Sequence, residues 1–183
     1  SGFLNDQKIL NILKNNTFNI FERNFKIIRK IISLALRTKI KFFLNDVYEN
    51  NQRLCLNFGH TFAHAVEMSL QSKKNDVLRH GEAVAIGMLC EVYYTEGKSK
   101  NFILLKKYLK LFKLPTNIEG FYKKKNKKKL KQNIYENIFL DKKKIGNYPR
   151  IISIKKTRKP EVIEMRSNKK ILKTIEDIIF ATL

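Results

Sequence analysis

Three histidines, His60, His64 and His80, are the residues of this chain best suited to chemistry. They are the only histidines among 183 residues, and all lie within a span of 21. Residues four apart lie about one turn from each other on one face of a helix, so His60 and His64 can converge on a metal or a substrate. Gly81, directly after His80, permits an unusual backbone path. The alternative is that these are ordinary hydrogen-bonded histidines.

Two further polar residues, Arg53 and Asn57, precede the first histidine. The apolar residues of segment 54–70 are in helical register, which predicts one helix there. On a continuous helix Asn57, His60 and His64 would share a face, with Arg53 one further turn away. Arginine binds phosphate or carboxylate through two parallel hydrogen bonds, so a substrate carrying either group would suit this arrangement. The alternative for Arg53 is a solvent-exposed helix end.

The net charge of +22, from 38 basic and 16 acidic residues, suggests nucleic acid or an anionic membrane as partner. However, 30 of the basic residues are lysine and 8 are arginine, whereas nucleic-acid surfaces normally draw on arginine. Codon bias in an A/T-rich genome explains such a lysine excess without selection for binding polyanions. We therefore expect no nucleic-acid partner. The densest charge run, 123–131, is expected to be a solvated loop or helix start, with an anion-binding patch as the alternative.

The pattern of apolar residues predicts a mainly α fold. Helices are expected near 4–14, 21–45, 54–70, 81–94, 102–112 and 169–181, and residues 134–140 carry a periodic apolar pattern. Residues 149–154 and 162–166 should pair as a small two-stranded ribbon near the C-terminus. Helix 21–45 should face the core with an apolar stripe, and helix 81–94, small or apolar nearly all round, should be buried. The length suits a single domain over residues 1–183.

Other features concern the environment of the chain. No run of 18 or more uncharged apolar residues could span a bilayer, so we expect no membrane partner and a soluble, cytoplasmic protein. Cys55 and Cys90 lack CxxC spacing and are too few for a disulfide framework, which favours a reducing compartment. The N-terminus has no Met and no signal-peptide pattern, and Ser1-Gly2 is expected to be a cut inside a longer chain.

Two motifs around the histidines resemble the signature of the 3-dehydroquinate synthase family. They read LNFGHTFAHAVE over residues 56–67 and HGEAVAIGM over residues 80–88. The resemblance also takes in Ser1-Gly2 through Lys8, and Leu114-Pro115-Thr116 downstream. It covers the C-terminal, mostly helical half of that enzyme, and implies a dehydroquinate synthase-like α domain with a multi-helix, bundle-like architecture.

What the resemblance implies about activity is specific. The family converts 3-deoxy-arabino-heptulosonate 7-phosphate to 3-dehydroquinate and phosphate, a lyase reaction of the shikimate pathway of aromatic amino acid biosynthesis. It uses NAD transiently and one divalent metal, zinc or possibly cobalt. NAD lies mainly on an N-terminal Rossmann-like domain that this chain lacks, so the fragment alone should be inactive. The expected partners are the sugar-phosphate substrate, that N-terminal domain, and a second copy in a homodimer.

The resemblance also implies roles for individual residues. His60 and His80 match the metal ligands, and His64 matches the histidine that contacts substrate and helps with proton transfer. This assignment replaces the pairing of His60 with His64 that helical spacing alone suggests. The other matched positions are catalytic Lys8 and Lys39, substrate-binding Arg53 and Asn57, and one active-site lysine that is either Lys142 or Lys143.

One position departs from the family pattern. The family's third metal ligand is a glutamate, and Asn5 stands there in this chain. Asparagine offers a neutral carbonyl oxygen, so the metal loses its protein anion and should bind more weakly. Three explanations compete: a decayed inactive copy, a weaker site completed by substrate oxygens, or a local shift that brings in Asp6. Two other functions stay open: another sugar phosphate cyclase of the same superfamily, and a basic nucleic-acid-binding module around residues 123–131.

Overall fold

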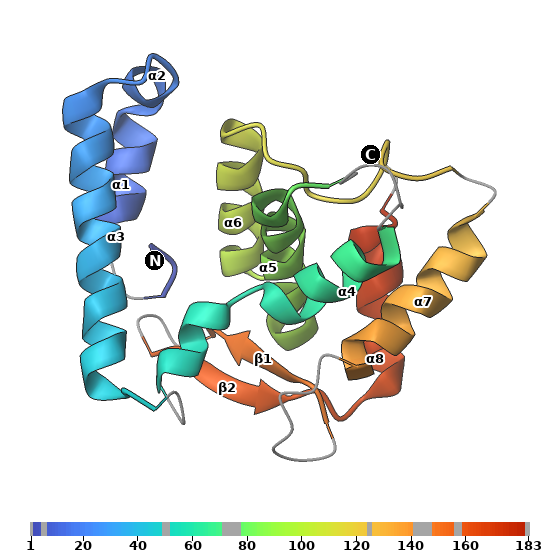
Figure 1. Ribbon diagram of the computed structural model, residues 1–183. Coiled ribbons are helices and arrows are strands. Elements are labelled where there is room, and N and C mark those ends of the chain that lie inside the picture. Colours follow the sequence, from blue (N-terminus) through green and yellow to red (C-terminus); the bar gives the residue numbers. More distant parts are fainter. Residues whose placement is uncertain are drawn as a thin grey trace. The chain divides into compact units, whose positions relative to one another are not determined.

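The computed structural model describes residues 2–4, 7–48, 52–70, 78–123, 126–140, 148–155 and 159–181 (Figure 1). The helical elements are α1 (Gln7–Asn15), α2 (Thr17–Phe21), α3 (Phe25–Asn45), η1 (Gln52–Asn57), α4 (His60–Leu70), α5 (His80–Glu96), α6 (Lys100–Leu111), α7 (Lys127–Leu140), α8 (Asn168–Thr174) and η3 (Ile175–Ile179). Strands β1 (Arg150–Ser153) and β2 (Glu161–Glu164) form a two-stranded antiparallel sheet. The predicted mainly α fold with a small ribbon is confirmed.

The chain divides into two compact units. One comprises residues 1–56 and 153–162, and the other comprises residues 57–152 and 163–183. The first contains α1, α2 and α3, whereas the second contains all helices from α4 onward. The single domain over residues 1–183 stays a prediction.

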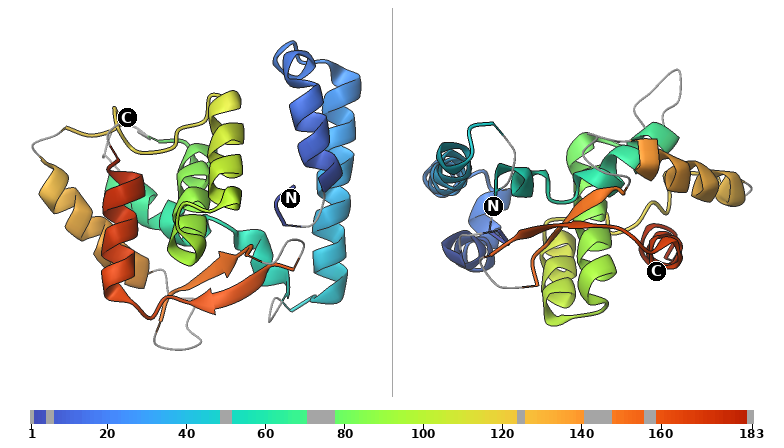
Figure 2. Two further views of the ribbon diagram at one scale, coloured as in Figure 1. Left: turned by 180° about the vertical axis from the view of Figure 1, so that it is seen from behind. Right: turned by 90° about the horizontal axis from the view of Figure 1, so that it is seen from below.

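The first unit is built on a helical hairpin. Helices α1 and α3 lie side by side, and the short α2 turns the chain between them (Figures 1 and 2). The side chain of Asn24 accepts a hydrogen bond from the Ile27 N–H at 3.2 Å, which caps the start of α3. Arg23 adopts a left-handed conformation with φ 54°. The helix predicted from residue 21 therefore begins at residue 25.

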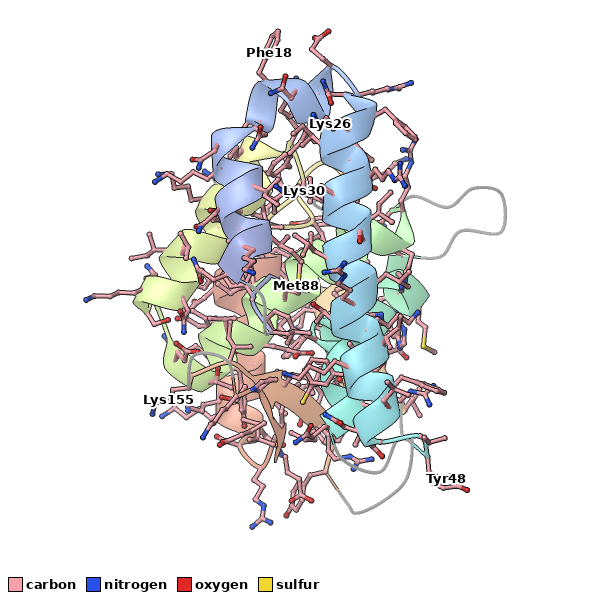
Figure 3. The ribbon with its side chains drawn as sticks, turned by 90° about the vertical axis from the view of Figure 1, so that its left-hand side faces the viewer. Phe18, Lys26, Lys30, Tyr48, Met88 and Lys155 are labelled. Carbon is pink, nitrogen blue, oxygen red and sulfur yellow. The ribbon has the colours of Figure 1, made fainter. Side chains whose placement is uncertain are left out.

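The apolar stripe of α3 is largely exposed. Phe25, Ile32 and Leu36 keep 77%, 59% and 54% of their surface accessible, and the buried residues of α3 are Thr38 and Phe42. Figure 3 shows this unit from the side of α3, with Phe18 and Tyr48 pointing outward at opposite ends. The prediction that this stripe faces a core is wrong for most of its length, because α3 has 21 residues and α1, its main partner within the unit, has 9.

The second unit is organised around α5. Nine of its residues are buried, from Ala83 to Tyr94, and it packs against α4, α6, α8 and η3. Figures 1 and 2 show α5 and α6 running side by side. Small residues such as Ala83, Ala85 and Gly87 let neighbouring helices approach its backbone closely. The prediction of a buried helix here is confirmed.

The lysine-rich run leads into α7. The helix begins at Lys127, and its buried residues Leu130, Ile134 and Ile138 lie on the side that packs against α4 and η3. The ammonium groups of Lys127 and Lys131 bind the two carboxylate oxygens of Glu176 at 3.1 and 2.7 Å. Within the described part of the run, the helix start is thus as predicted, and two of its lysines form ion pairs with a carboxylate of the same chain.

Two expectations about the environment can be compared with this structure. Across the ranges that the structure describes, no helix combines the length and apolar character needed to cross a bilayer. Cys55 and Cys90 are buried free thiols, in line with the expected absence of a disulfide framework. Burial raises the pKa of Cys55 to about 11, so this thiol stays protonated and inert.

Candidate metal and substrate site

The start of α4 rests on the backbone of α5. Gly59, the residue before α4, has φ +89°, and a Cβ atom there would lie 2.8 Å from both the Met88 nitrogen and the Val84 oxygen. On the other side of the contact, a Cβ atom on Gly87 would lie 1.9 Å from the Gly59 oxygen. The labelled Met88 in Figure 3 marks this part of α5. Two glycines, one from each sequence motif, therefore bring the histidine-bearing helices together backbone to backbone.

This contact breaks the helix that the sequence predicted over residues 54–70. The structure has a short 3₁₀ helix, η1, up to Asn57, and α4 begins three residues later at His60. The positive φ of Gly59 ends helical geometry between them. The prediction that Asn57 and Arg53 extend the His60–His64 helix face is therefore wrong, although His60 and His64 do share one helix.

The three imidazole rings form one cluster. The ring centroid of His60 lies 5.6 Å from that of His64 and 5.4 Å from that of His80, and His64 and His80 are 6.1 Å apart. His60 and His64 are half-buried, whereas His80 is exposed. His80 is fixed as the first residue of α5, because the Glu82 carboxylate accepts the Arg79 N–H at 2.9 Å and caps that helix. The histidines that cluster in the sequence thus also cluster in space.

A carboxylate that the sequence reasoning missed completes the cluster. The Glu67 oxygens lie 3.0 and 3.3 Å from Nδ1 of His80, a hydrogen-bonding distance. Glu67 follows His60 by seven residues and His64 by three, a spacing that places all three on one face of α4. This spacing could have identified it. With Nδ1 of His80 as the donor to this carboxylate, Nε2 of the neutral imidazole is the atom available to a cation.

Burial favours the neutral form of His60. Burial lowers the pKa of His60, the charges of His64 and His80 lower it further, and the Phe58 carbonyl, 3.4 Å from Nδ1, opposes the shift. A neutral imidazole is the form that binds metals. The burial of His60 therefore favours the form of the imidazole that can bind a cation.

The donor set fits a divalent cation. One ligand atom from each of His64, Glu67 and His80 can be chosen so that all lie within 4.8 Å of one another, and the His60 ring adjoins this group. Imidazole and carboxylate are ligands that zinc takes at about 2.0–2.2 Å, so Glu67 can either bind a cation directly or orient the His80 ring through their hydrogen bond. A bound cation would contract the cluster slightly. The assigned roles, in which His60 and His80 bind the metal and His64 contacts the substrate, stay predictions.

The remaining predicted residues do not all fall in this unit. Asn57 does, and it is half-buried. Lys8, Lys39 and Arg53 belong to the other unit, on α1, α3 and η1 respectively. Lys8 and Lys39 are exposed. Asn5, Lys142 and Lys143 lie outside the described residues, as does Asp6, so their predicted roles are not tested by this structure.

Arg53 is held by its own unit. Its backbone N–H donates to the Asp46 carboxylate at 3.0 Å, and its guanidinium donates to the Val47 carbonyl at 2.8 Å. The guanidinium also lies over the Phe43 ring, 4.9 Å from the centroid. These contacts fix the orientation of its side chain. They do not support the alternative that Arg53 is an ordinary exposed helix end.

Comparison with known proteins places these motifs in a family. The sequence model described as 3-dehydroquinate synthase C-terminal matches residues 1–144. The chain is 32% identical over 177 residues to 3-dehydroquinate synthase of Dictyoglomus thermophilum, covering 96% of this chain and 47% of that protein. It is 31% identical over 182 residues to the enzyme of Clostridium tetani, covering 97% of this chain and 45% of that protein. The chain thus spans about half the length of these relatives.

A solved structure shares the fold. It is ValA (2-epi-5-epi-valiolone synthase) from Streptomyces hygroscopicus subsp. jinggangensis, a structure with NAD+ and Zn2+ bound. The TM-score is 0.73 at 14% sequence identity, and the match covers 94% of this chain and 46% of that one. This likeness shows the fold alone. Because the family sequence model covers most of the chain, with both histidine motifs inside it, the chain belongs to the 3-dehydroquinate synthase family and corresponds to its C-terminal domain.

Proposed function

We propose that this chain is the metal- and substrate-binding part of a 3-dehydroquinate synthase, which forms 3-dehydroquinate and phosphate from 3-deoxy-arabino-heptulosonate 7-phosphate in the shikimate pathway. The observation that carries the proposal is the cluster of three imidazoles, whose ring centroids are 5.4 to 6.1 Å apart and whose two motifs lie within the residues that match the family model. Family membership, with relatives named for this reaction, supports the choice of substrate.

The residues take distinct roles in this proposal. His60 and His80 hold a zinc or cobalt ion, with Glu67 orienting the His80 ring. When bound, such an ion would act as a Lewis acid that lowers the pKa of substrate hydroxyls. His64 faces the same cluster and is placed to accept or donate a proton at a substrate oxygen. The cationic and amide side chains that bind the carboxylate and phosphate are Lys8, Lys39, Arg53, Asn57 and either Lys142 or Lys143.

The rest of the site belongs to partners of this domain. NAD is bound mainly by an N-terminal half of the same enzyme, and the relatives, about twice as long as this chain, have room for one. We also propose a homodimer and a cytoplasmic location. A chain restricted to the C-terminal domain would then bind metal but lack the hydride acceptor, and would be inactive by itself.

The function is tested by assaying the full-length protein with zinc and NAD. We expect release of phosphate together with formation of 3-dehydroquinate from the heptulosonate phosphate. A seven-carbon sugar phosphate that lacks the carboxylate is the competing substrate. Turnover of that compound alone would identify another sugar phosphate cyclase. Failure to turn over either compound, with metal and NAD bound, would identify a decayed copy and overturn the proposal.

The Glu67–His80 hydrogen bond leads to a separate prediction about zinc affinity. Glu67→Gln should weaken zinc binding about 10- to 100-fold, because the amide is a poorer acceptor for the Nδ1–H and no longer fixes the ring orientation. Competition with a chromophoric zinc chelator measures the affinity. The matched control is Glu136→Gln on α7, an exposed glutamate whose contact is with Gln132, and it should bind zinc like the wild type. Equal zinc affinity of both variants would contradict the assigned role of Glu67.

A further inference from the structure

The lysine-rich run of residues 123–131 borders a pocket that has no part in the chemistry described so far. This pocket lies within the second unit, where α7 packs against the C-terminal end of α4 (Figure 1). Its volume is about 340 Å³. Ligand pockets in proteins typically have volumes of about 300–1,000 Å³, so this space suits a small organic molecule rather than a single ion.

The lining of this pocket is cationic. Lys123 and Lys129 supply its charged groups, and no acidic residue in the described part of the chain lines it. Lys127 and Lys131 lie two residues before and after Lys129, on the opposite side of α7, where both bind Glu176. Neither Lys123 nor Lys129 forms an ion pair within the ranges that the structure describes. Their charges can therefore be neutralised by an anion in the pocket.

Amide and apolar groups complete the lining. Asn126 and Asn133 lie three residues before and four residues after Lys129, so the three side chains share one side of α7 and of the turn before it. The carboxamide N–H groups can donate to an anion beside the lysine. Asn126 and Lys129 are exposed, whereas Asn133 and Leu70 are half-buried and Leu130 is buried. The pocket thus combines cationic and amide donors at its exposed side with apolar side chains further inside.

This pocket is distinct from the histidine cluster, because none of the three histidines lines it. Ser69, which does line it, follows Glu67 by two residues, a step of about 200° around α4. The pocket therefore lies on the other side of α4 from the face that carries His60, His64 and Glu67. On that side the Asn137 amide of α7 donates to the Ser69 hydroxyl oxygen at 2.9 Å, which holds the two helices together.

We infer that this pocket binds a small organic phosphate monoester, with the phosphate on Lys123 and Lys129 and the organic part against Leu70 and Leu130. A phosphate monoester carries a charge of about −1.5 to −2 at pH 7, which matches the charge of two lysines, and lysine is a common phosphate ligand. The carboxamide of Asn133 supplies a further donor to the phosphate oxygens. This site is additional to the proposed substrate site, and its assignment does not depend on the proposed function.

Isothermal titration calorimetry of the metal-free, full-length protein with phenyl phosphate, at constant ionic strength, tests this site. We expect the wild type to bind phenyl phosphate and Lys129→Met to weaken that binding about tenfold or more, because it removes a charge-assisted hydrogen bond. Asn133→Leu keeps the volume but removes the amide, and should weaken binding about three- to tenfold. Lys128→Met is the matched control: Lys128 is exposed on the same turn of α7 and does not line the pocket, so this variant should bind like the wild type.

Two further ligands separate the parts of the phosphate monoester. Phenol lacks the phosphate, and inorganic phosphate lacks the organic part. Each should bind at least about tenfold more weakly than phenyl phosphate, because the inferred site uses the lysines and the apolar side chains together. Equal affinities for inorganic phosphate and phenyl phosphate would contradict the assignment of an organic ligand.

The inferred site is wrong if Lys129→Met and Lys128→Met bind phenyl phosphate equally well, or if the wild type does not bind it. Binding that Arg53→Met abolishes and Lys129→Met leaves intact would assign the phosphate to the proposed substrate site instead. If the wild type binds polyuridylate but not phenyl phosphate, and Lys128→Met and Lys129→Met weaken that binding alike, the run is a basic surface for polyanions rather than a pocket. Because the titration uses no zinc, NAD or heptulosonate phosphate, none of these outcomes depends on the proposed function.

Discussion

Replacing Gly87 with alanine is expected to destabilise the second unit by about 3 kcal/mol or more. A Cβ atom at this position would lie 1.9 Å from the Gly59 oxygen and 3.0 Å from the Ala63 nitrogen. Both neighbours are backbone atoms of the α4 start, so relief requires moving the whole helix rather than turning a side chain. Urea unfolding of wild type and variant measures the change in the free energy of unfolding.

The matched control lies on the same helix. Gly81 is exposed, and a Cβ atom there would have no neighbour within 4 Å. Gly81→Ala should therefore leave the unfolding free energy unchanged or raise it by up to about 1 kcal/mol, because alanine has the higher helix propensity. Near-equal stabilities of Gly87→Ala and Gly81→Ala would show that α4 and α5 do not meet backbone to backbone. The described placement of the histidine-bearing helices would then be wrong.

Removing either assigned metal ligand is expected to have the largest functional effect. His60→Ala and His80→Ala should each weaken zinc binding by more than about 100-fold, because loss of a ligand should exceed the 10- to 100-fold effect typical of residues that only orient one. The turnover rate of the full-length protein should fall by at least the same factor as its zinc affinity. Zinc affinity by competition and initial rates under saturating zinc give the two quantities separately.

His64→Ala distinguishes the two assignments of the cluster. If His64 contacts the substrate, this variant should retain zinc affinity within about tenfold of wild type, while kcat falls by about 100-fold or more from loss of proton transfer. The grouping of His64 with Glu67 and His80 allows the other outcome, in which His64 is itself a ligand. A loss of zinc affinity as large as that of His60→Ala would identify His64 as a metal ligand and contradict the motif-based assignment.

Much of the fold and the site could be predicted from the sequence. The apolar pattern of residues 81–94 predicts a buried helix, and α5 is buried. The two histidine motifs predict a cluster, and the three rings meet. Such features can be predicted from a single sequence, because they follow from the local spacing of apolar residues or from the residues of a motif.

The features that sequence reasoning missed depend on tertiary contacts. Helical periodicity continues through Gly59, but Gly59 has a positive φ where its backbone meets that of α5 at Gly87, and helical geometry is interrupted at Gly59. The stripe of α3 has helical spacing, but spacing does not show whether a partner long enough to cover it is present. Glu91 could have been noticed as an acid among the apolar residues of α5, yet its hydrogen-bond partner, the Ile152 N–H, comes from β1, distant in the sequence.

The most direct test of the account is X-ray absorption spectroscopy of the zinc-loaded full-length protein, beside His60→Ala and His80→Ala. We predict one zinc per chain with at least two imidazole nitrogens at about 2.0–2.1 Å, and the loss of one nitrogen from that shell in each variant. A zinc shell without imidazole, or one that neither substitution changes, would contradict the claim that His60 and His80 share a single cation.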